Sequence, residues 1–361
     1  MYCSDQISLE EKIGQMIIVG FHGKTIHENK ILKKQISYGH ISGVVLHSYN
    51  FDSKEELATL TNDINNIASK IPLFISVDQE GGYVSRLSEK NGFTNFASAK
   101  DIATKKTVNE ASLIYLQMAK MLATVDINLN LAPDCDVDIN PQSPAIGKWK
   151  RSFSANPSTV VKYAHVFIEA HKKEHILTAI KHYPGHGSAT GDTHNGMVDV
   201  TNTWDEKEII PFAELIKNSN VDIIMTAHIM NKSIDTDYPA SLSQIHINEI
   251  LRKKLDYNGV VITDDLQMGA ISKNYGFKES IIKAINAGSD ILLFANSYNN
   301  DPNLVYKIID TIVQAINEKI IDINKINKSY ERIMKLKNLL SASTTRSPIF
   351  LKTYQPFVAT A

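Results

Sequence analysis

Cysteine is scarce in this chain, which has only Cys3 and Cys135 among its 361 residues. Two cysteines are too few for a disulfide framework, and their spacing is not that of a metal site. An excess of charge of one sign is also absent, because 38 lysines and arginines stand against 39 aspartates and glutamates, giving a formal net charge of −1. A chain without a global electrostatic field is a poor binder of polyanions, so we expect no nucleic-acid partner.

Long apolar runs are absent as well. No stretch resembles a membrane-spanning helix, and the first five residues are not a charged segment before an apolar one. We therefore expect a soluble, cytoplasmic protein without a membrane span. We also expect a monomer or a weak dimer. A periplasmic or exported protein is the alternative if Met1 replaces a removed signal.

The chain instead contains short apolar runs that alternate with helical segments. Eight runs have the length and composition of buried strands, at residues 15–20, 43–47, 73–78, 127–132, 176–180, 221–228, 259–264 and 290–294. Seven segments between them have helical spacing, at residues 28–36, 54–68, 108–123, 157–171, 206–217, 243–255 and 277–287.

Strands that are apolar on both faces and alternate with helices are typical of a parallel sheet covered by helices, and eight such units favour a closed (β/α)₈ barrel. An open doubly wound sheet is the alternative, but no glycine-rich turn follows the first strand. We expect residues 1–340 to form one barrel with an active site at the carboxyl ends of its strands. Residues 341–361, rich in serine and threonine, are expected to pack loosely or to be partly disordered.

The segment from Lys181 to His194 concentrates chemically active side chains. It holds a lysine, three histidines and an aspartate among one proline and three glycines, so we expect the preceding strand to end near Ile180 and a loop to follow. Asp192 and His194 are close enough for the carboxylate to contact the ring and favour imidazolium, which can donate and recover a proton near neutral pH. The alternative is a surface loop whose polar residues have no function.

A zinc site is a second interpretation of the same histidines. His182, His186, His194 and His228 could converge on an ion together with several aspartates. His182 and His186 are separated by a Pro-Gly pair, however, which excludes the geometry of two histidines on one helix face. We therefore expect no metal and no cofactor.

Carboxylates stand at the ends of two other predicted strands. Asp264 and Asp265 end the seventh strand, and Asp78 ends the third, with Glu80 two residues later. A carboxylate fixed at a strand end suits nucleophilic or electrostatic work on a cationic transition state. An aspartate there could instead cap the following helix, and of two adjacent aspartates one can cap while the other faces the substrate.

Four motifs together resemble the bacterial β-N-acetylglucosaminidases of glycoside hydrolase family 3. They are DQEGG (78–82), NPQSPAIG with the following RSF (140–153), KHYPGHG with DTH (181–194) and ITDDLQMGAI (262–271), in the family's order. The likeness extends from about Leu9 to Leu340. It implies a single (β/α)₈ barrel without the second sandwich domain of larger members, and a retaining hydrolase that removes terminal N-acetylglucosamine through a covalent glycosyl-enzyme.

The resemblance also implies roles for individual residues. By position in the motifs, Asp264 matches the nucleophile, His194 the general acid/base and Asp192 the carboxylate that orients it, while Asp265 supports or caps. The residues that grip the terminal sugar match Asp78, Arg86, Arg151, Lys181 and His182. Carboxylate acceptors and arginine or lysine donors are suited to sugar hydroxyls.

A role in peptidoglycan recycling is a further implication, with cleavage of the β-1,4 bond between N-acetylglucosamine and (anhydro-)N-acetylmuramic acid in muropeptides. A β-glucosidase and an N-acetylglucosaminide phosphorylase of the same family are alternatives. The Asp-x-His loop favours N-acetylglucosaminides, because the family's glucosidases usually draw an acidic acid/base from elsewhere. An inactive sugar-binding protein is the alternative of another class, against which the joint presence of Asp192, His194 and Asp264 argues.

Two features depart from the family pattern. Tyr83 stands where many relatives have arginine after DQEGG, and the link before RSF is longer and contains Trp149. We expect Trp149 either to stack on a sugar in a neighbouring subsite or to pack against the barrel rim. The content of Gly185, Gly187 and Gly191 in the catalytic loop suggests that this loop closes over bound sugar.

Overall fold

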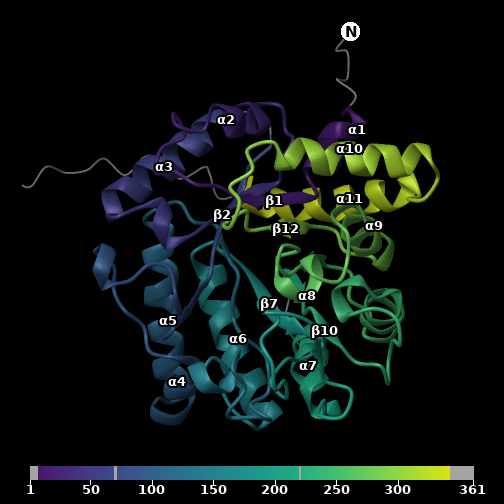
Figure 1. Cartoon of the computed structure of the whole chain (residues 1–361). Helices are drawn as coiled ribbons and strands as arrows, with labels where there is room; N and C mark the ends of the chain where they lie inside the picture. Colours follow the sequence, from purple (N-terminus) through teal and green to yellow (C-terminus); the bar gives the residue numbers. More distant parts are fainter. Residues whose placement is uncertain (1–6, 69–70, 219–220, 342–361) are drawn as a thin grey trace, which may run out of the picture.

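The computed structural model describes residues 7–68, 71–218 and 221–341, which form a barrel of eight parallel strands surrounded by helices (Figure 1). The strands are β1 (Ile17–Gly20), β2 (Gly43–Leu46), β3 (Phe74–Val77), β6 (Leu129–Asn130), β7 (Leu177–Tyr183), β9 (Ile223–Thr226), β11 (Val260–Thr263) and β12 (Leu292–Phe294). Their order in the sheet is β11, β9, β7, β6, β3, β2, β1, β12. A parallel bridge between Ile262 and Ile291 brings the two outermost strands together, so the barrel is nearly closed.

Helices connect the strands and cover the outside of the sheet. They are α2 (Lys30–Ser37), α3 (Lys54–Ile67), α5 (Val108–Ala123), α6 (Pro157–Lys173), α7 (Ile210–Asn218), the π-helix η6 (Ile245–Lys254), α9 (Phe277–Ala287) and α10 (Leu304–Asn317). Additional helices are α1 (Leu9–Gly14), α4 (Ala99–Lys105), α8 (Gly269–Ser272) and α11 (Ile323–Ser341). Helices α1, α10 and α11 lie together beside β1 and β12 (Figure 1).

Two short strand pairs lie outside the barrel. The hairpin of β4 (Gln79–Gly81) and β5 (Val84–Ser85) follows β3, and β8 (Val198–Asp199) pairs with β10 (Ile229–Met230). Both pairs belong to loops that follow the carboxyl ends of barrel strands, where function is carried in this architecture.

Helix starts follow local capping chemistry. The Thr107 side chain accepts the backbone N–H of Glu110, and the Glu110 carboxylate accepts the backbone N–H of Thr107, which forms a capping box at the start of α5. Helix α6 begins at Pro157, whose missing N–H costs nothing in the first turn, and the Asn156 side chain accepts the N–H of Ser158. These contacts explain why both helices start where the sequence predicts.

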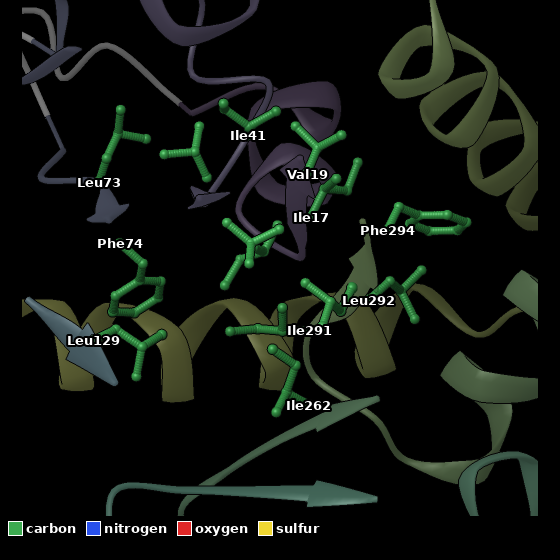
Figure 2. Close-up of a cluster of buried hydrophobic side chains, with 14 of the residues drawn as sticks. Ile17, Val19, Ile41, Leu73, Phe74, Leu129, Ile262, Ile291, Leu292 and Phe294 are labelled. Atoms are coloured by element: carbon green, nitrogen blue, oxygen red, sulfur yellow. The ribbon is translucent and has the colours of Figure 1, made fainter. Parts of the chain in front are cut away.

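Apolar side chains of the strands and of the helices around them form a large buried cluster. Figure 2 shows part of this cluster, with Ile17, Val19, Ile41, Leu73, Phe74, Leu129, Ile262, Ile291, Leu292 and Phe294 labelled. Every residue of β1, β2, β3, β9 and β11 is buried, which explains their continuous rather than alternating apolar runs. Burial of this apolar surface is the main source of stability, at about 25 cal/mol per Å².

The prediction of eight strands in a parallel barrel is confirmed, but the predicted end of β7 was wrong. Strand β7 runs to Tyr183, so Lys181 and His182 lie in the strand and the loop begins after it. The Lys181 N–H donates to the Pro133 carbonyl at 3.2 Å, and the Lys181 carbonyl accepts the Cys135 N–H at 2.6 Å. Backbone pairing with the segment after β6 thus extends the strand beyond its apolar run.

The predicted tail lies outside the described residues from position 342 onward, and Ser341 is the last residue of α11. Among the helices of the described ranges, none has the length and apolar character needed to cross a membrane.

Candidate active site

A cavity of about 250 Å³ opens at the carboxyl ends of the barrel strands. Seven of the eight predicted site residues line it, namely Asp78, Arg86, Arg151, Lys181, His182, His194 and Asp264. The eighth, Asp192, is not among the lining residues but contacts His194, which is. The rest of the wall includes apolar side chains such as Leu131, Met225 and Met268. The barrel therefore brings residues from five separate parts of the chain to one small space.

The carboxylate of Asp78, directly after β3, forms ion pairs with two basic side chains. Its Oδ1 lies 2.8 Å from Lys181 Nζ, and its Oδ2 lies 3.1 Å from Arg86 Nη2. Burial alone would raise the pKa of Asp78, but the charges of Lys181 and Arg86 hold this pKa well below its ordinary value. The carboxylate stays ionised and fixed, which suits an acceptor of sugar hydroxyls.

Glu80 extends this ion network, although the sequence analysis gave it no role. Arg151 donates to both oxygens of Glu80, from Nε at 2.9 Å and from Nη2 at 2.8 Å, and Lys181 Nζ lies 2.7 Å from Glu80 Oε1. Burial opposes ionisation, but these two cations lower the pKa of Glu80 to about 2. Glu80 thus orients Arg151 and Lys181, two predicted sugar-binding residues. Its position within the DQEGG motif is the sequence feature that could have indicated this role.

His182 is held by a carboxylate that the sequence did not reveal. Its Nδ1 lies 2.7 Å from Asp136 Oδ2, and its Nε2 lies 3.2 Å from Arg151 Nη2. Asp136 also accepts the backbone N–H groups of His182 and His186. The two residues of the pair are 46 positions apart, so no spacing rule could have linked them.

His194 and Asp192 form the predicted pair. The Nδ1 atom of His194 lies 2.7 Å from Asp192 Oδ1, and the backbone N–H of His194 donates to the same oxygen at 2.9 Å. Partial burial would raise the pKa of Asp192, but the contacts with His194 lower it below its ordinary value. With Nδ1 occupied, Nε2 is the ring nitrogen left for the cavity. The His194 side chain is 60% exposed, so it lies at the mouth of the cavity.

The loop that carries this pair is tied to neighbouring elements. The N–H groups of Gly269 and Ala270 in α8 donate to the carbonyls of His194 and Thr193, at 3.1 and 2.9 Å. A Cβ on Gly187 would lie 1.7 Å from the carbonyl oxygen of Val137. The close approach of the Val137 backbone therefore explains why residue 187 is a glycine. Closure of the loop over bound sugar stays a prediction.

Asp264 lies at the end of β11, and its backbone N–H donates to the Thr226 carbonyl at 3.1 Å. Burial would raise the pKa of Asp264, but the nearby His228, His182 and His194 lower it. Asp265 is different, because burial raises its pKa to about 6. Its Oδ1 accepts the N–H groups of Gln267 and Ala295, each at 3.0 Å, which gives Asp265 the expected supporting role.

The alternative interpretation, four histidines converging on zinc, does not match the arrangement of the described residues. His228 is buried and contacts the Ser241 hydroxyl and the Asp265 carbonyl, at 2.7 and 2.9 Å. Within the described ranges, the group with metal-ligand spacing is Asp134, Asp136 and His182. Asp136 and His182 already bind each other, and Arg151 Nε lies 3.5 Å from Asp134. The positive guanidinium of Arg151 at that distance disfavours a metal ion beside Asp134. We therefore interpret the three residues as part of the hydrogen-bond network of the site.

Trp149 stacks on Tyr83, and the two residues are those that depart from the family pattern. Their ring centroids are 3.7 Å apart with an interplanar angle of 15°. The indole N–H of Trp149 donates to the Pro144 carbonyl at 2.8 Å. Trp149 thus packs against Tyr83, which is 64% exposed and keeps accessible surface. Stacking of Trp149 on a sugar stays a prediction.

A (β/α)₈ barrel with charged side chains gathered in one cavity at the carboxyl ends of its strands has the architecture of a barrel enzyme. The chain belongs to glycosyl hydrolase family 3, because the family model described as the glycosyl hydrolase family 3 N-terminal domain matches residues 8–336.

Several curated relatives are named as β-hexosaminidases. The chain is 32% identical over 309 residues to the β-hexosaminidase of Haemophilus influenzae (strain PittEE), with 84% of each chain covered. It is 33% identical over 335 residues to β-hexosaminidase A of Pseudoalteromonas piscicida, covering 87% of this chain and 56% of that protein. The chain therefore spans little more than half the length of the second relative.

Solved structures have the same fold. A family 3 β-N-acetylglucosaminidase from Paenibacillus sp. str. FPU-7 superposes with a TM-score of 0.88 at 29% identity, over 98% of this chain and 66% of that one. The β-N-acetylhexosaminidase from Beutenbergia cavernae DSM 12333 superposes with a TM-score of 0.84 at 26% identity, over 92% of this chain and 99% of that one. The predicted family and barrel are confirmed by these findings.

Proposed function

We propose that the protein is a retaining exo-β-N-acetylglucosaminidase, with Asp264 as nucleophile and the His194–Asp192 pair as general acid/base. The observation that carries the proposal is that Asp264 and His194 line the same cavity although they are seventy positions apart. The names of the relatives support the activity, and the lowered pKa of Asp264 supports a carboxylate that is ionised at neutral pH.

The reaction has two steps. In the first, an Asp264 oxygen bonds to the anomeric carbon as the glycosidic bond breaks, and the proton on His194 Nε2 passes to the leaving oxygen. In the second, His194 takes a proton from water, the water oxygen bonds to the anomeric carbon, and the bond to Asp264 breaks. Two inversions retain the β configuration.

Asp192 makes His194 suited to both steps. Its carboxylate contacts Nδ1 and stabilises the imidazolium that donates the proton. Most retaining glycosidases use two carboxyl groups about 5–5.5 Å apart, and here a histidine takes the place of one of them. A carboxylate separation therefore cannot be used to assign stereochemistry in this site.

The ion network supports recognition of a single terminal sugar. Asp78, Arg86, Lys181, Arg151 and His182 present acceptors and donors on the cavity wall, and each contacts at least one other member. Such mutual contacts hold the side chains in place before the sugar arrives. Apolar lining in the same cavity suits the methyl group of an acetamide.

We propose a muropeptide as natural substrate, with cleavage between N-acetylglucosamine and (anhydro-)N-acetylmuramic acid during peptidoglycan recycling in the cytoplasm. The motif resemblance supports this role. Turnover of such a disaccharide more slowly than that of N,N′-diacetylchitobiose would contradict the substrate, and recovery of the native protein outside the cytoplasm in fractionated cells would contradict the location.

The activity is tested by product release from p-nitrophenyl N-acetylglucosaminide and from the matching glucoside, with and without phosphate. We expect release from the N-acetylglucosaminide that does not depend on phosphate. Faster release from the glucoside would favour a β-glucosidase. A sugar 1-phosphate product would favour a phosphorylase, and binding without turnover would favour an inactive sugar-binding protein.

A further inference from the structure

A second hollow adjoins the active-site cavity beside His194. It has a volume of about 480 Å³ and is lined mainly by residues of α8, the start of α9 and the segment after β12. His194 and Tyr298 line both hollows. The two hollows therefore border each other at His194 and Tyr298.

The lining of this second hollow combines aromatic rings with a positive charge. Tyr298 is 75% exposed and Phe277 is 40% exposed, so both offer accessible ring surface. Lys273 is the one lysine or arginine among the described residues that line the hollow, and these include no aspartate or glutamate. This combination suits a ligand with a ring and a carboxylate.

Lys273 is already positioned by one contact. Its Nζ donates to the backbone carbonyl of Asn195 at 2.8 Å, next to His194. An ammonium group has three donors, so donors remain for a ligand. The position of the charge beside the acid/base loop is thus fixed in part by the loop itself.

The role of His194 gives the second hollow a place in the reaction. A general acid must lie within hydrogen-bond reach of the leaving oxygen, so the leaving group lies next to His194. When the terminal sugar occupies the cavity with Asp264, the leaving group lies on the side of His194, where the second hollow adjoins the cavity.

We propose that the second hollow binds the leaving group, and that Lys273 selects a leaving sugar that carries a carboxylate. The inference rests on the proposed function and narrows its substrate to the disaccharide without attached peptide, because the peptide of a muropeptide is amide-linked to this carboxyl group. Neutral leaving groups enter the same hollow without the contribution of Lys273.

The test compares two substrates that differ in one charge, N-acetylglucosaminyl-β-1,4-N-acetylmuramic acid and its neutral methyl amide. For Lys273→Met we expect kcat/KM to fall about fivefold on the acid and less than about twofold on the amide, as for one exposed ion pair. The difference should shrink at high salt because exposed charges are screened. Lys278→Met removes a neighbouring charge that does not line the hollow and should leave both substrates unchanged.

A purely structural role of Lys273 has a different signature. If its contact with Asn195 only holds the loop in place, the acid and the amide lose the same factor, which overturns the proposal. Unchanged rates on both substrates overturn it as well. Failure of the wild-type protein to hydrolyse any N-acetylglucosaminide would instead refute the proposed function.

Ser272→Trp is an independent test, because Ser272 lines the hollow from the exposed end of α8. The larger side chain should lower kcat/KM on both disaccharides by at least about tenfold through a steric clash. N-acetylglucosaminyl fluoride, whose leaving group needs no second hollow, should react at the wild-type rate. Wild-type turnover of the disaccharides by this variant would contradict the assignment.

Discussion

At the scale of single residues, Asp192 makes two contacts with His194, to the ring Nδ1 and to the backbone N–H. The first contact stabilises charge on the ring, and the second fixes the ring relative to the loop. Glu80 acts in a similar way on Lys181 and Arg151, since it binds both without being a predicted sugar ligand itself. Carboxylates that orient the proposed catalytic and sugar-binding groups are thus a recurring feature around this cavity.

Asp192→Asn should lower kcat on an alkyl or sugar glycoside by about 10²-fold, because it removes the charge that stabilises the imidazolium. The loss should be smaller on p-nitrophenyl N-acetylglucosaminide, whose leaving group needs less protonation. Asp199→Asn, an exposed aspartate on β8, is the control. Equal losses on the two kinds of substrate would contradict a role in proton transfer.

Glu80→Gln should lower the free energy of unfolding by about 3–5 kcal/mol at neutral pH, because two buried cations lose their shared partner. Chemical denaturation measures this value. The exposed Glu331→Gln on α11 should change it little. A near-neutral effect of Glu80→Gln would show that the network does not depend on this charge.

The same residue predicts a pH dependence of stability. The pKa of Glu80 falls from its ordinary value of 4.5 to about 2 on folding, so the folded state binds fewer protons between these values. The contribution of ionised Glu80 to the free energy of unfolding is complete above pH 4.5 and is lost as the pH falls toward about 2. The stability of Glu80→Gln should therefore decline less steeply than that of the wild type over this window.

At the scale of elements, the sequence predicts β7 only as far as its apolar run. Lys181 and His182 are polar, and their strand conformation depends on pairing with the backbone after β6, which no local pattern records. The helix boundaries of α5 and α6 were accessible, because capping residues mark them. Local chemistry is readable from sequence, whereas a partner supplied by another part of the chain is not.

Gly187→Ala tests how the loop that carries Asp192 and His194 is held. A Cβ at this position would meet the Val137 carbonyl oxygen at 1.7 Å, so the loop must shift. We expect a stability loss of about 1–3 kcal/mol, with a fall in kcat because Asp192 and His194 move with the loop. Gly196→Ala in the same loop meets no atom within 4 Å and serves as control. Similar behaviour of the two variants would contradict this view of the loop.

At the scale of the whole molecule, the barrel places distant residues side by side because the carboxyl ends of all strands meet at one face. Asp78 and Lys181 are 103 positions apart and form an ion pair. The alternation of strands and helices was enough to predict this architecture, and the motifs predicted seven of the residues that line the cavity. The Tyr83–Trp149 stack and the second hollow were not predictable, since both arise from how separate loops pack together.

The most direct test of the account is to identify the residue that carries the glycosyl group. The protein is inactivated with a 5-fluoro N-acetylglucosaminyl donor, digested, and analysed by mass spectrometry. We predict that the label is found on the peptide that contains Asp264, and that Asp264→Ala is neither labelled nor active. A label on any other residue, or near-normal turnover by Asp264→Ala, would contradict the central claim.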